Sequence, residues 1–228
     1  MPGSGILFVV STPIGNLEDI TLRAIRILRE SDVILCEDTR VCRRLLSHFE
    51  IERPKLLRYD EHIEERIIPE VKDMLDNGLK VSLVSNAGTP TIQDPGYRLV
   101  RALRLEKYQV VPIPGASALI AALSVSGCPT DSFVFYGFLP RKEGKRKRLM
   151  ESWENEERTI IFYESPERIV RTLKELKGFE KLSGRFIFIG REMTKYHEEY
   201  MFERLEDFNE NELVTKGEFV VILEGSRG

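Results

Sequence analysis

The first half of the chain alternates short apolar runs with longer segments in which apolar residues recur every three or four positions. The apolar runs predict strands at residues 6–11, 32–37, 55–59, 80–85 and 108–113. Helical spacing is clearest over residues 21–30 and 65–78. Strands that alternate with helices are typical of βαβ units. We therefore expect a mostly parallel sheet with helices on both faces.

The pattern changes beyond residue 114. A short helix of small residues is expected in "SALIAALSVSG", and a second helix over residues 165–178, with Ser165 as its cap and Pro166 in its first turn. Apolar runs predict strands at residues 133–138, 158–163, 185–190, 198–203 and 218–225. Strands near the end follow one another without helices, which favours antiparallel pairing. The sequence thus predicts two α/β domains, residues 1–114 with a mostly parallel sheet and residues 115–228 with a mixed or antiparallel sheet.

Composition narrows the classes of protein to consider. The chain has 228 residues, of which 42% are hydrophobic, enough for a sizeable core. No apolar run approaches the roughly 18 to 20 residues of a membrane span, and the first residues do not resemble a secretory signal. Three cysteines (Cys36, Cys42 and Cys128) show no metal-ligand spacing, so we expect neither a zinc site nor disulfides, and a cytoplasmic location fits best.

Four loops directly follow predicted strands: "TPIGNLED", "EDTR", "NAGTPTIQDPG" and "PGASA". The carboxyl ends of parallel strands share one edge of a sheet, where ligands bind in folds of this kind. Gly15, Gly88 and Gly115 would let the main chain approach a ligand closely. Any one of these loops could instead be a simple turn. The chain has neither GxGxxG in the first loop nor GxxxxGK[ST] anywhere, which favours a nucleoside-like ligand of little negative charge and disfavours a nicotinamide oxidoreductase.

A basic segment stands out in a chain whose net charge is −3. Its basic residues are Arg141, Lys142, Lys145, Arg146, Lys147 and Arg148. Clustered positive charge favours a local site for a polyanion such as a nucleic-acid backbone. The alternative is a solvated helix start that the acidic residues at 151–157 balance.

Two further charged clusters each allow more than one interpretation. In "CEDTRVCRR", Glu37 or Asp38 could be a general base beside the phosphate anchors Arg40 and Arg43, or Asp38 could simply cap the next helix. In "REMTKYHEEY", Lys195 lies among acidic residues near a lone histidine. No nucleophile pairs with that histidine, so covalent catalysis is unsupported.

Seven motifs carry a resemblance to a known family. They are, in order, "TPIGNLEDITLRA", "CEDTR", "SNAGTPTIQDPG", "PGASA", "FYGFLPRK", "YESPER" and "REMTKYHEE". In this order they closely resemble the ribosomal RNA small-subunit methyltransferase I family. That family belongs to the tetrapyrrole methylase-like superfamily, the class III S-adenosylmethionine (SAM) methyltransferases. The resemblance covers nearly the whole chain.

The resemblance implies that SAM is held between two α/β domains of a homodimer. The reaction it implies is 2′-O-methylation of a cytidine in 16S ribosomal RNA, with the RNA or the assembled small ribosomal subunit as partner. By match, the SAM-binding residues would be Pro13, Asn86, Ala87, Gly88, Thr89, Pro114, Gly115, Ala116, Ser117, Ala118, Tyr163 and Glu192.

The chain departs from the family pattern at two motif positions. The family usually has Asp at position 86 and His at position 167, where this chain has Asn86 and Glu167, so no role is assigned to Glu167. Many relatives also continue beyond the position of Gly228 into a segment associated with RNA binding. That difference puts more of the expected RNA contact on the basic segment.

Methyl transfer to a ribose hydroxyl is an in-line displacement that needs alignment and removal of a proton, and it requires no metal. The candidate bases are Glu37, Asp38 and Lys195, and the candidate RNA contacts are Arg40, Arg43 and the basic segment. Two rivals remain. One is the same fold acting on a tetrapyrrole or another small substrate, which the dense basic segment disfavours. The other is a non-catalytic RNA-binding protein, which would not bind SAM.

Overall fold

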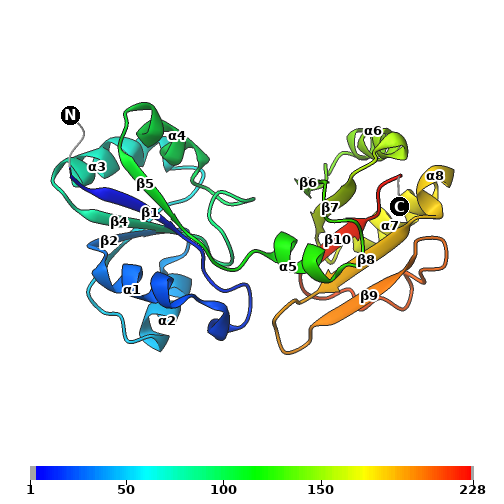
Figure 1. Cartoon of the computed structure of the whole chain (residues 1–228), viewed down its shortest axis with the longest axis horizontal. Coiled ribbons are helices and arrows are strands. Elements are labelled where there is room, and N and C mark those ends of the chain that lie inside the picture. The colour runs from blue at the N-terminus through cyan, green and yellow to red at the C-terminus, as the bar shows by residue number, and fades with distance from the viewer. Residues whose placement is uncertain (1–3, 227–228) are drawn as a thin grey trace. The chain divides into compact units, whose positions relative to one another are not determined.

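The computed structural model describes residues 4–226 and separates into two compact units, Met1–Ser117 and Ala118–Gly228 (Figure 1). The sequence prediction placed this division between residues 114 and 115. Each unit contains one five-stranded sheet.

The first unit is built on a parallel sheet, as predicted. Its strands are β1 (Ile6–Val10), β2 (Val33–Cys36), β3 (Lys55–Arg58), β4 (Lys80–Val84) and β5 (Gln109–Ile113). They lie in the order β3-β2-β4-β1-β5, and every neighbouring pair is parallel. The apolar runs identified these strands to within a residue or two, most clearly β2 and β4, which are buried along nearly their whole length.

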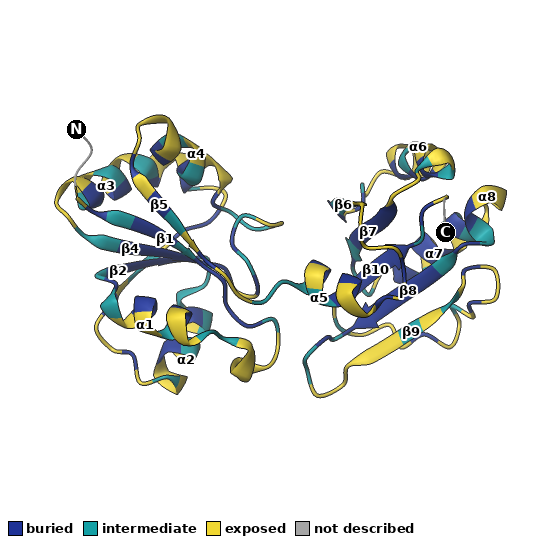
Figure 2. Cartoon of the chain, viewed as in Figure 1, coloured by how far each residue is buried: buried dark blue, intermediate teal, exposed yellow. Residues whose placement is uncertain are grey.

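Helices cover both faces of this sheet, which confirms the predicted fold class. They are the short 3₁₀ helix η1 (Leu17–Asp19), α1 (Leu22–Glu30), α2 (Thr39–His48), α3 (Glu64–Asp76) and α4 (Tyr97–Leu105). One core cluster packs α1 and α2 against residues such as Val10 and Ile34. A second packs α3 and α4 against residues such as Leu7 and Leu35. Buried positions therefore line the sheet and the inner sides of the helices, while the outer sides are exposed (Figure 2).

The second unit has a mixed sheet, also as predicted. Its elements are α5 (Ala118–Val125), β6 (Phe133–Phe138), α6 (Glu143–Ser152), η2 (Trp153–Asn155), β7 (Thr159–Glu164), α7 (Ile169–Lys177), α8 (Glu180–Ser183), β8 (Phe186–Arg191), β9 (Glu199–Arg204) and β10 (Phe219–Leu223). The strand order is β6-β7-β10-β8-β9. The pair β6–β7 is parallel and the other neighbours are antiparallel.

Helix α7 begins later than its sequence suggests. The predicted start used the Ser165 side chain as a cap, but the helix begins at Ile169 and has no side-chain cap. Ser165 instead closes a turn with its main chain, since its carbonyl accepts the N–H groups of Arg168 and Ile169 at 3.0 Å each. The prediction of a Ser165 cap was therefore wrong.

Strand order places two loops at a topological switch point. Strands β1 and β4 are neighbours, yet the chain leaves β1 for α1 on one face and leaves β4 for α4 on the other. Loops that depart in opposite directions from adjacent parallel strands leave a crevice at the carboxyl edge, where ligands of open α/β sheets bind.

A buried carboxylate fixes the far end of the loop that follows β4. Glu64 Oε1 accepts the main-chain N–H groups of Gly96 and Arg98 at 3.0 and 2.9 Å and the Tyr59 hydroxyl at 2.8 Å. The N–H groups at the start of α4 would otherwise lack acceptors. Gly96 has φ 134°, and a Cβ there would lie 2.8 Å from Leu83 Cδ2, so only glycine fits.

Replacing Glu64 with alanine should therefore destabilise the first unit. We expect Glu64→Ala to lower the free energy of unfolding by about 3 kcal/mol, because several buried donors lose their acceptor together. The neighbouring Glu65→Ala is the control, since Glu65 is exposed and pairs only at the surface with Arg98. Urea unfolding measures both variants. Equal losses would show that Glu64 does not anchor the loop.

Candidate active site

Main-chain pairing joins the loops that follow β1 and β4. Thr12 N–H donates to the Gly88 carbonyl at 2.9 Å, and Gly88 N–H donates to the Thr12 carbonyl at 3.1 Å. The Thr12 hydroxyl also donates to the Ser85 carbonyl at 3.2 Å. The two loops at the switch point are thus held to one another.

A pair of hydroxyl groups adds the loop that follows β5. Thr89 Oγ1 donates to the Ala116 carbonyl at 3.0 Å and lies 3.0 Å from Ser11 Oγ. Because the single Thr89 hydroxyl hydrogen goes to Ala116, the Ser11 hydroxyl is the donor in the second bond. Gly115 lies so close that a Cβ there would be 2.8 Å from Ser11 Cβ. Three loops far apart in sequence therefore form one surface at the carboxyl edge of the sheet.

This surface contains the predicted SAM-binding residues of the first unit. Pro13 and Gly88 are buried, whereas Asn86, Ala87 and the segment 114–115 are exposed. Thr89, Ala116 and Ser117 are partly exposed, as is Ala118, where the second unit begins. Residues 86–89 and 114–117 carry no charged side chain. Main-chain groups beside small uncharged side chains fit the neutral adenosyl part of SAM.

The loop after β2 settles the two interpretations of Asp38. Asp38 is the N-cap of α2: its Oδ1 accepts the Arg40 N–H at 2.8 Å, and its carboxylate pairs with the Arg40 guanidinium at 3.1 and 2.7 Å. Arg40 holds the pKa of Asp38 well below its ordinary value. A cap with so low a pKa is a poor proton acceptor, so the prediction of Asp38 as the base is corrected. Arg43 is exposed.

Asn86 connects the loops after β2 and β4. Its Nδ2 donates to Glu37 Oε2 at 3.0 Å. An amide can donate to this carboxylate, whereas the Asp that the family usually has would be a second negative charge beside it. The departure at position 86 therefore has a physical counterpart in this chain, a hydrogen bond from the Asn86 amide to Glu37.

Lys195 lies between two carboxylates in the second unit. Its Nζ is 2.8 Å from Glu192 Oε1 and 2.9 Å from Glu218 Oε2. Burial acts to lower the pKa of Lys195, but the two carboxylates outweigh it and raise the pKa above its ordinary value. A lysine that stays protonated cannot accept a proton, so the prediction of Lys195 as a base is also corrected.

Tyr163 and Glu192, which are predicted SAM-binding residues of the second unit, have partners within that unit. Glu192 accepts the Glu218 N–H at 2.9 Å in addition to pairing with Lys195. The Tyr163 ring packs edge-on against Phe135 and Phe138, with centroids 5.0 and 5.7 Å apart. Their role in binding SAM stays a prediction.

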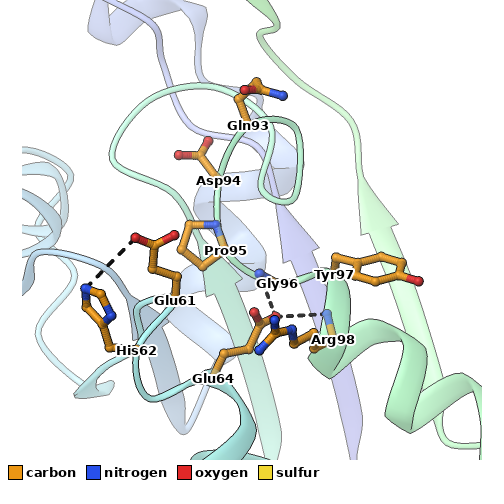
Figure 3. A pocket seen from close by; sticks show the side chains of 9 residues that line it. All are labelled: Glu61, His62, Glu64, Gln93, Asp94, Pro95, Gly96, Tyr97 and Arg98. Atoms are coloured by element: carbon orange, nitrogen blue, oxygen red, sulfur yellow. Dashed lines mark hydrogen bonds and ion pairs between the residues drawn. The ribbon is translucent and has the colours of Figure 1, made fainter. Parts of the chain in front are cut away.

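Asp94 is a candidate that the sequence analysis missed. Its half-buried side chain lines a pocket of about 490 Å³ at the end of the β4 loop (Figure 3). Burial and, to a smaller extent, the charge of Glu37 raise the pKa of Asp94 to about 6, and a hydrogen bond from Ser85 opposes them. The signal that could have found it is an acidic residue inside "SNAGTPTIQDPG", a loop otherwise without charge.

The basic segment forms the start of α6, and one of its members is not a surface residue. Arg146 is only 2% exposed. Its Nε and Nη2 donate to the two Glu175 oxygens at 2.6 and 2.7 Å, and its Nη1 donates to the carbonyls of Pro140 and Arg141. The prediction that Arg146 contacts phosphates was wrong, because its donors are used inside the protein. The remaining basic residues are exposed: Arg141, Lys142, Lys145, Lys147 and Arg148.

Residues 4–226 contain neither a cluster of metal-ligating side chains nor a membrane-spanning helix. No three His, Cys, Asp or Glu residues within this range are grouped so that they could hold a metal ion. No helix within it is long and apolar enough to span a bilayer.

Comparison with known proteins places the chain among methyltransferases. The family model for tetrapyrrole (corrin/porphyrin) methylases matches residues 7–209. A relative from Halalkalibacterium halodurans, named ribosomal RNA small subunit methyltransferase I, is 46% identical over 97% of this chain and 76% of its own length. A relative of the same name from Thermotoga maritima is 45% identical over 97% of this chain and 99% of its own length.

Solved structures share the fold at low sequence identity. Uroporphyrin-III C-methyltransferase from Thermus thermophilus, in complex with S-adenosylhomocysteine, has a TM-score of 0.65 at 20% identity and covers 97% of each chain. Cobalt precorrin-4 methyltransferase has a TM-score of 0.67 at 14% identity and covers 99% of this chain and 96% of its own. These neighbours confirm the architecture.

The burial of Arg146 gives a direct test by mutation. Arg146→Ala should lower the free energy of unfolding by about 3 kcal/mol, because it leaves a partly buried Glu175 without its bidentate partner. Arg148→Ala, an exposed change in the same helix, should alter it by less than about 0.5 kcal/mol. Chemical denaturation followed by tryptophan fluorescence reports on this unit, since Trp153 is in its core. Similar stabilities for the two variants would contradict the conclusion that Arg146 stabilises the fold through Glu175.

Proposed function

This chain belongs to the tetrapyrrole methylase family, and from that premise we propose that it transfers the methyl group of SAM to small-subunit ribosomal RNA. The observation that carries the proposal is the identity of about 45% to relatives named ribosomal RNA small subunit methyltransferase I, over 97% of this chain. A match over 97% of the chain extends across both units and the positions of the seven motifs.

The first unit supplies a surface suited to the cofactor. Main-chain groups at 86–89 and 114–117 would hold the adenosyl part of SAM, with Pro13 beneath them and Ala118, Tyr163 and Glu192 as the remaining proposed contacts. When bound, SAM supplies a methyl group on an already activated sulfonium. The protein's task is then to orient the acceptor oxygen in line with the methyl group and to remove a proton.

The acceptor we propose is the 2′-hydroxyl of a cytidine in 16S ribosomal RNA. Five exposed basic residues between Arg141 and Arg148, together with Arg43, would contact backbone phosphates. Arg40 is a weaker candidate, because its guanidinium is already paired with Asp38. Exposed positive charge clustered over residues 141–148 favours an extended polyanion such as RNA over a small tetrapyrrole. We further propose that the enzyme acts as a homodimer in the cytoplasm.

Labelled SAM tests the proposed function. The purified chain is incubated with labelled SAM and small ribosomal subunits that lack this methylation, and ribose methylation is then mapped. We expect label on one cytidine ribose of 16S RNA. Label on a porphyrinoid, or on no RNA at all, would overturn the proposal, and SAM binding without transfer would indicate a non-catalytic protein.

The salt dependence of RNA binding tests the role of the basic segment. Replacing Lys142, Lys145, Lys147 and Arg148 with serine should weaken binding and make the slope of log K against log salt concentration shallower by about 2 to 3. SAM affinity should not change. The matched control replaces Arg66, Arg101 and Lys107, which are exposed on or beside α3 and α4, with serine. An unchanged slope in the first variant, or an equal change in the control, would contradict the proposal that the basic segment contacts RNA phosphates.

A further inference from the structure

Methylation of a ribose hydroxyl needs a proton acceptor, and the structure narrows the choice. Asp38 is a helix cap paired with Arg40, and Lys195 is held as an ammonium by two carboxylates. Glu37 accepts a hydrogen bond from Asn86. We propose that Asp94 is the group that takes the proton from the 2′-hydroxyl, an inference that rests on the proposed function.

The loop that carries Asp94 is fixed on both sides of it. Before Asp94, Gly88 is paired with Thr12 of the neighbouring loop. After it, Gly96 is held by the buried Glu64 carboxylate. Between these anchors Gln93 has φ 63°, a left-handed conformation that a side chain adopts at a cost. A carboxylate held in this way keeps one position relative to the carboxyl edge of the sheet.

The pocket that Asp94 lines has the size of a ligand site. Its volume of about 490 Å³ lies within the range usual for small-molecule pockets. Figure 3 shows the Asp94 side chain beside this space, while the Glu64 carboxylate is directed to the N–H groups of Gly96 and Arg98. Glu64 is therefore occupied, and Asp94 is the half-buried carboxylate of this lining that remains for a ligand.

Other charged groups around the pocket do not take this role. On the lining they are Glu61, His62, Glu64 and Arg98. Glu37, at the end of β2, is not on the lining, but its negative charge helps to raise the pKa of Asp94. Glu61 and His62 are exposed, with Glu61 Oε1 3.9 Å from His62 Nε2. Arg98 pairs with Glu65 at 2.8 Å. The charged groups of the lining other than Asp94 are thus either exposed or, like Glu64, bound to main-chain N–H groups, and Glu37 accepts the Asn86 amide.

The environment of Asp94 also gives it suitable basicity. Its pKa, raised to about 6 by burial and by Glu37, leaves it ionised at neutral pH yet more basic than an ordinary carboxylate. In the transfer, the bond between the 2′-oxygen and the methyl carbon forms as the bond between that carbon and sulfur breaks. The sulfonium leaves as a neutral thioether, and the hydroxyl proton passes to Asp94.

Asp94→Asn tests this role through kinetics rather than binding. We expect kcat to fall about 10²- to 10³-fold, because the amide cannot accept the proton. The KM for small subunits and the Kd for SAM should stay within about twofold of the unmutated values. The unmutated enzyme should gain activity as pH rises through about 6, since the carboxylate must be ionised. This rise, the acidic limb of the pH–activity profile, should be absent in Asp94→Asn and retained in Asp94→Glu.

The control is Glu61→Gln, which removes an exposed carboxylate from the same pocket and should leave kcat and the acidic limb unchanged. A kcat within about threefold of the unmutated enzyme in Asp94→Asn, or loss confined to KM, would overturn the proposal. Retention of the acidic limb in Asp94→Asn would do the same. If Asp94→Asn does not fold, a missing acidic limb in the unmutated enzyme would overturn it. Failure of the unmutated enzyme to label any RNA would instead refute the proposed function.

Discussion

The paired main chains of Thr12 and Gly88 are the constraint on which the candidate site depends. Strands β1 and β4 are neighbours, but their connections leave toward opposite faces of the sheet, so the loops at their ends would separate without a link. Two mutual hydrogen bonds between Thr12 and Gly88 provide that link. The Thr89 hydroxyl extends it to Ala116 after β5. The candidate binding surface is therefore set by the scaffold itself.

The β4 loop is conformationally costly, and a buried carboxylate compensates for part of the cost. Thr91 and Gln93 have φ values of 74° and 63°, in a region that side chains rarely occupy. Glu64 accepts main-chain N–H groups at the end of the same loop and so fixes its return into α4. An in-line displacement benefits from such rigidity, because alignment is then achieved on folding instead of at each turnover. The strained loop and the reaction we propose are thus connected.

Local patterns in the sequence predicted most of the architecture. Strands such as β2 and β10 are buried along their whole length, so they appear as continuous apolar runs. The parallel order of the first sheet followed from alternation, and the shared edge of the loops followed from parallelism. Helix α7 was misjudged at its start because Ser165 can close a turn with its main chain as readily as it can cap with its side chain.

The chemistry of single side chains depended on partners distant in sequence. Arg146 looks like its basic neighbours until Glu175, 29 positions away, is seen to bind it. Lys195 is held as an ammonium in part by Glu218. Asp94 acquires its basicity from burial and from Glu37, which belongs to another strand end. The spacing of residues along the sequence does not predict these contacts, because they form only when folding brings distant segments together.

Hydrogen exchange with and without SAM tests most directly whether this loop surface holds the cofactor. We expect SAM to slow amide exchange at residues 86–89 and 115–118 by at least about tenfold, because ligand contact suppresses local opening. Exchange on the outer turns of α3 should stay the same. Unchanged exchange in both loop segments at saturating SAM, with protection elsewhere in the chain, would contradict the account.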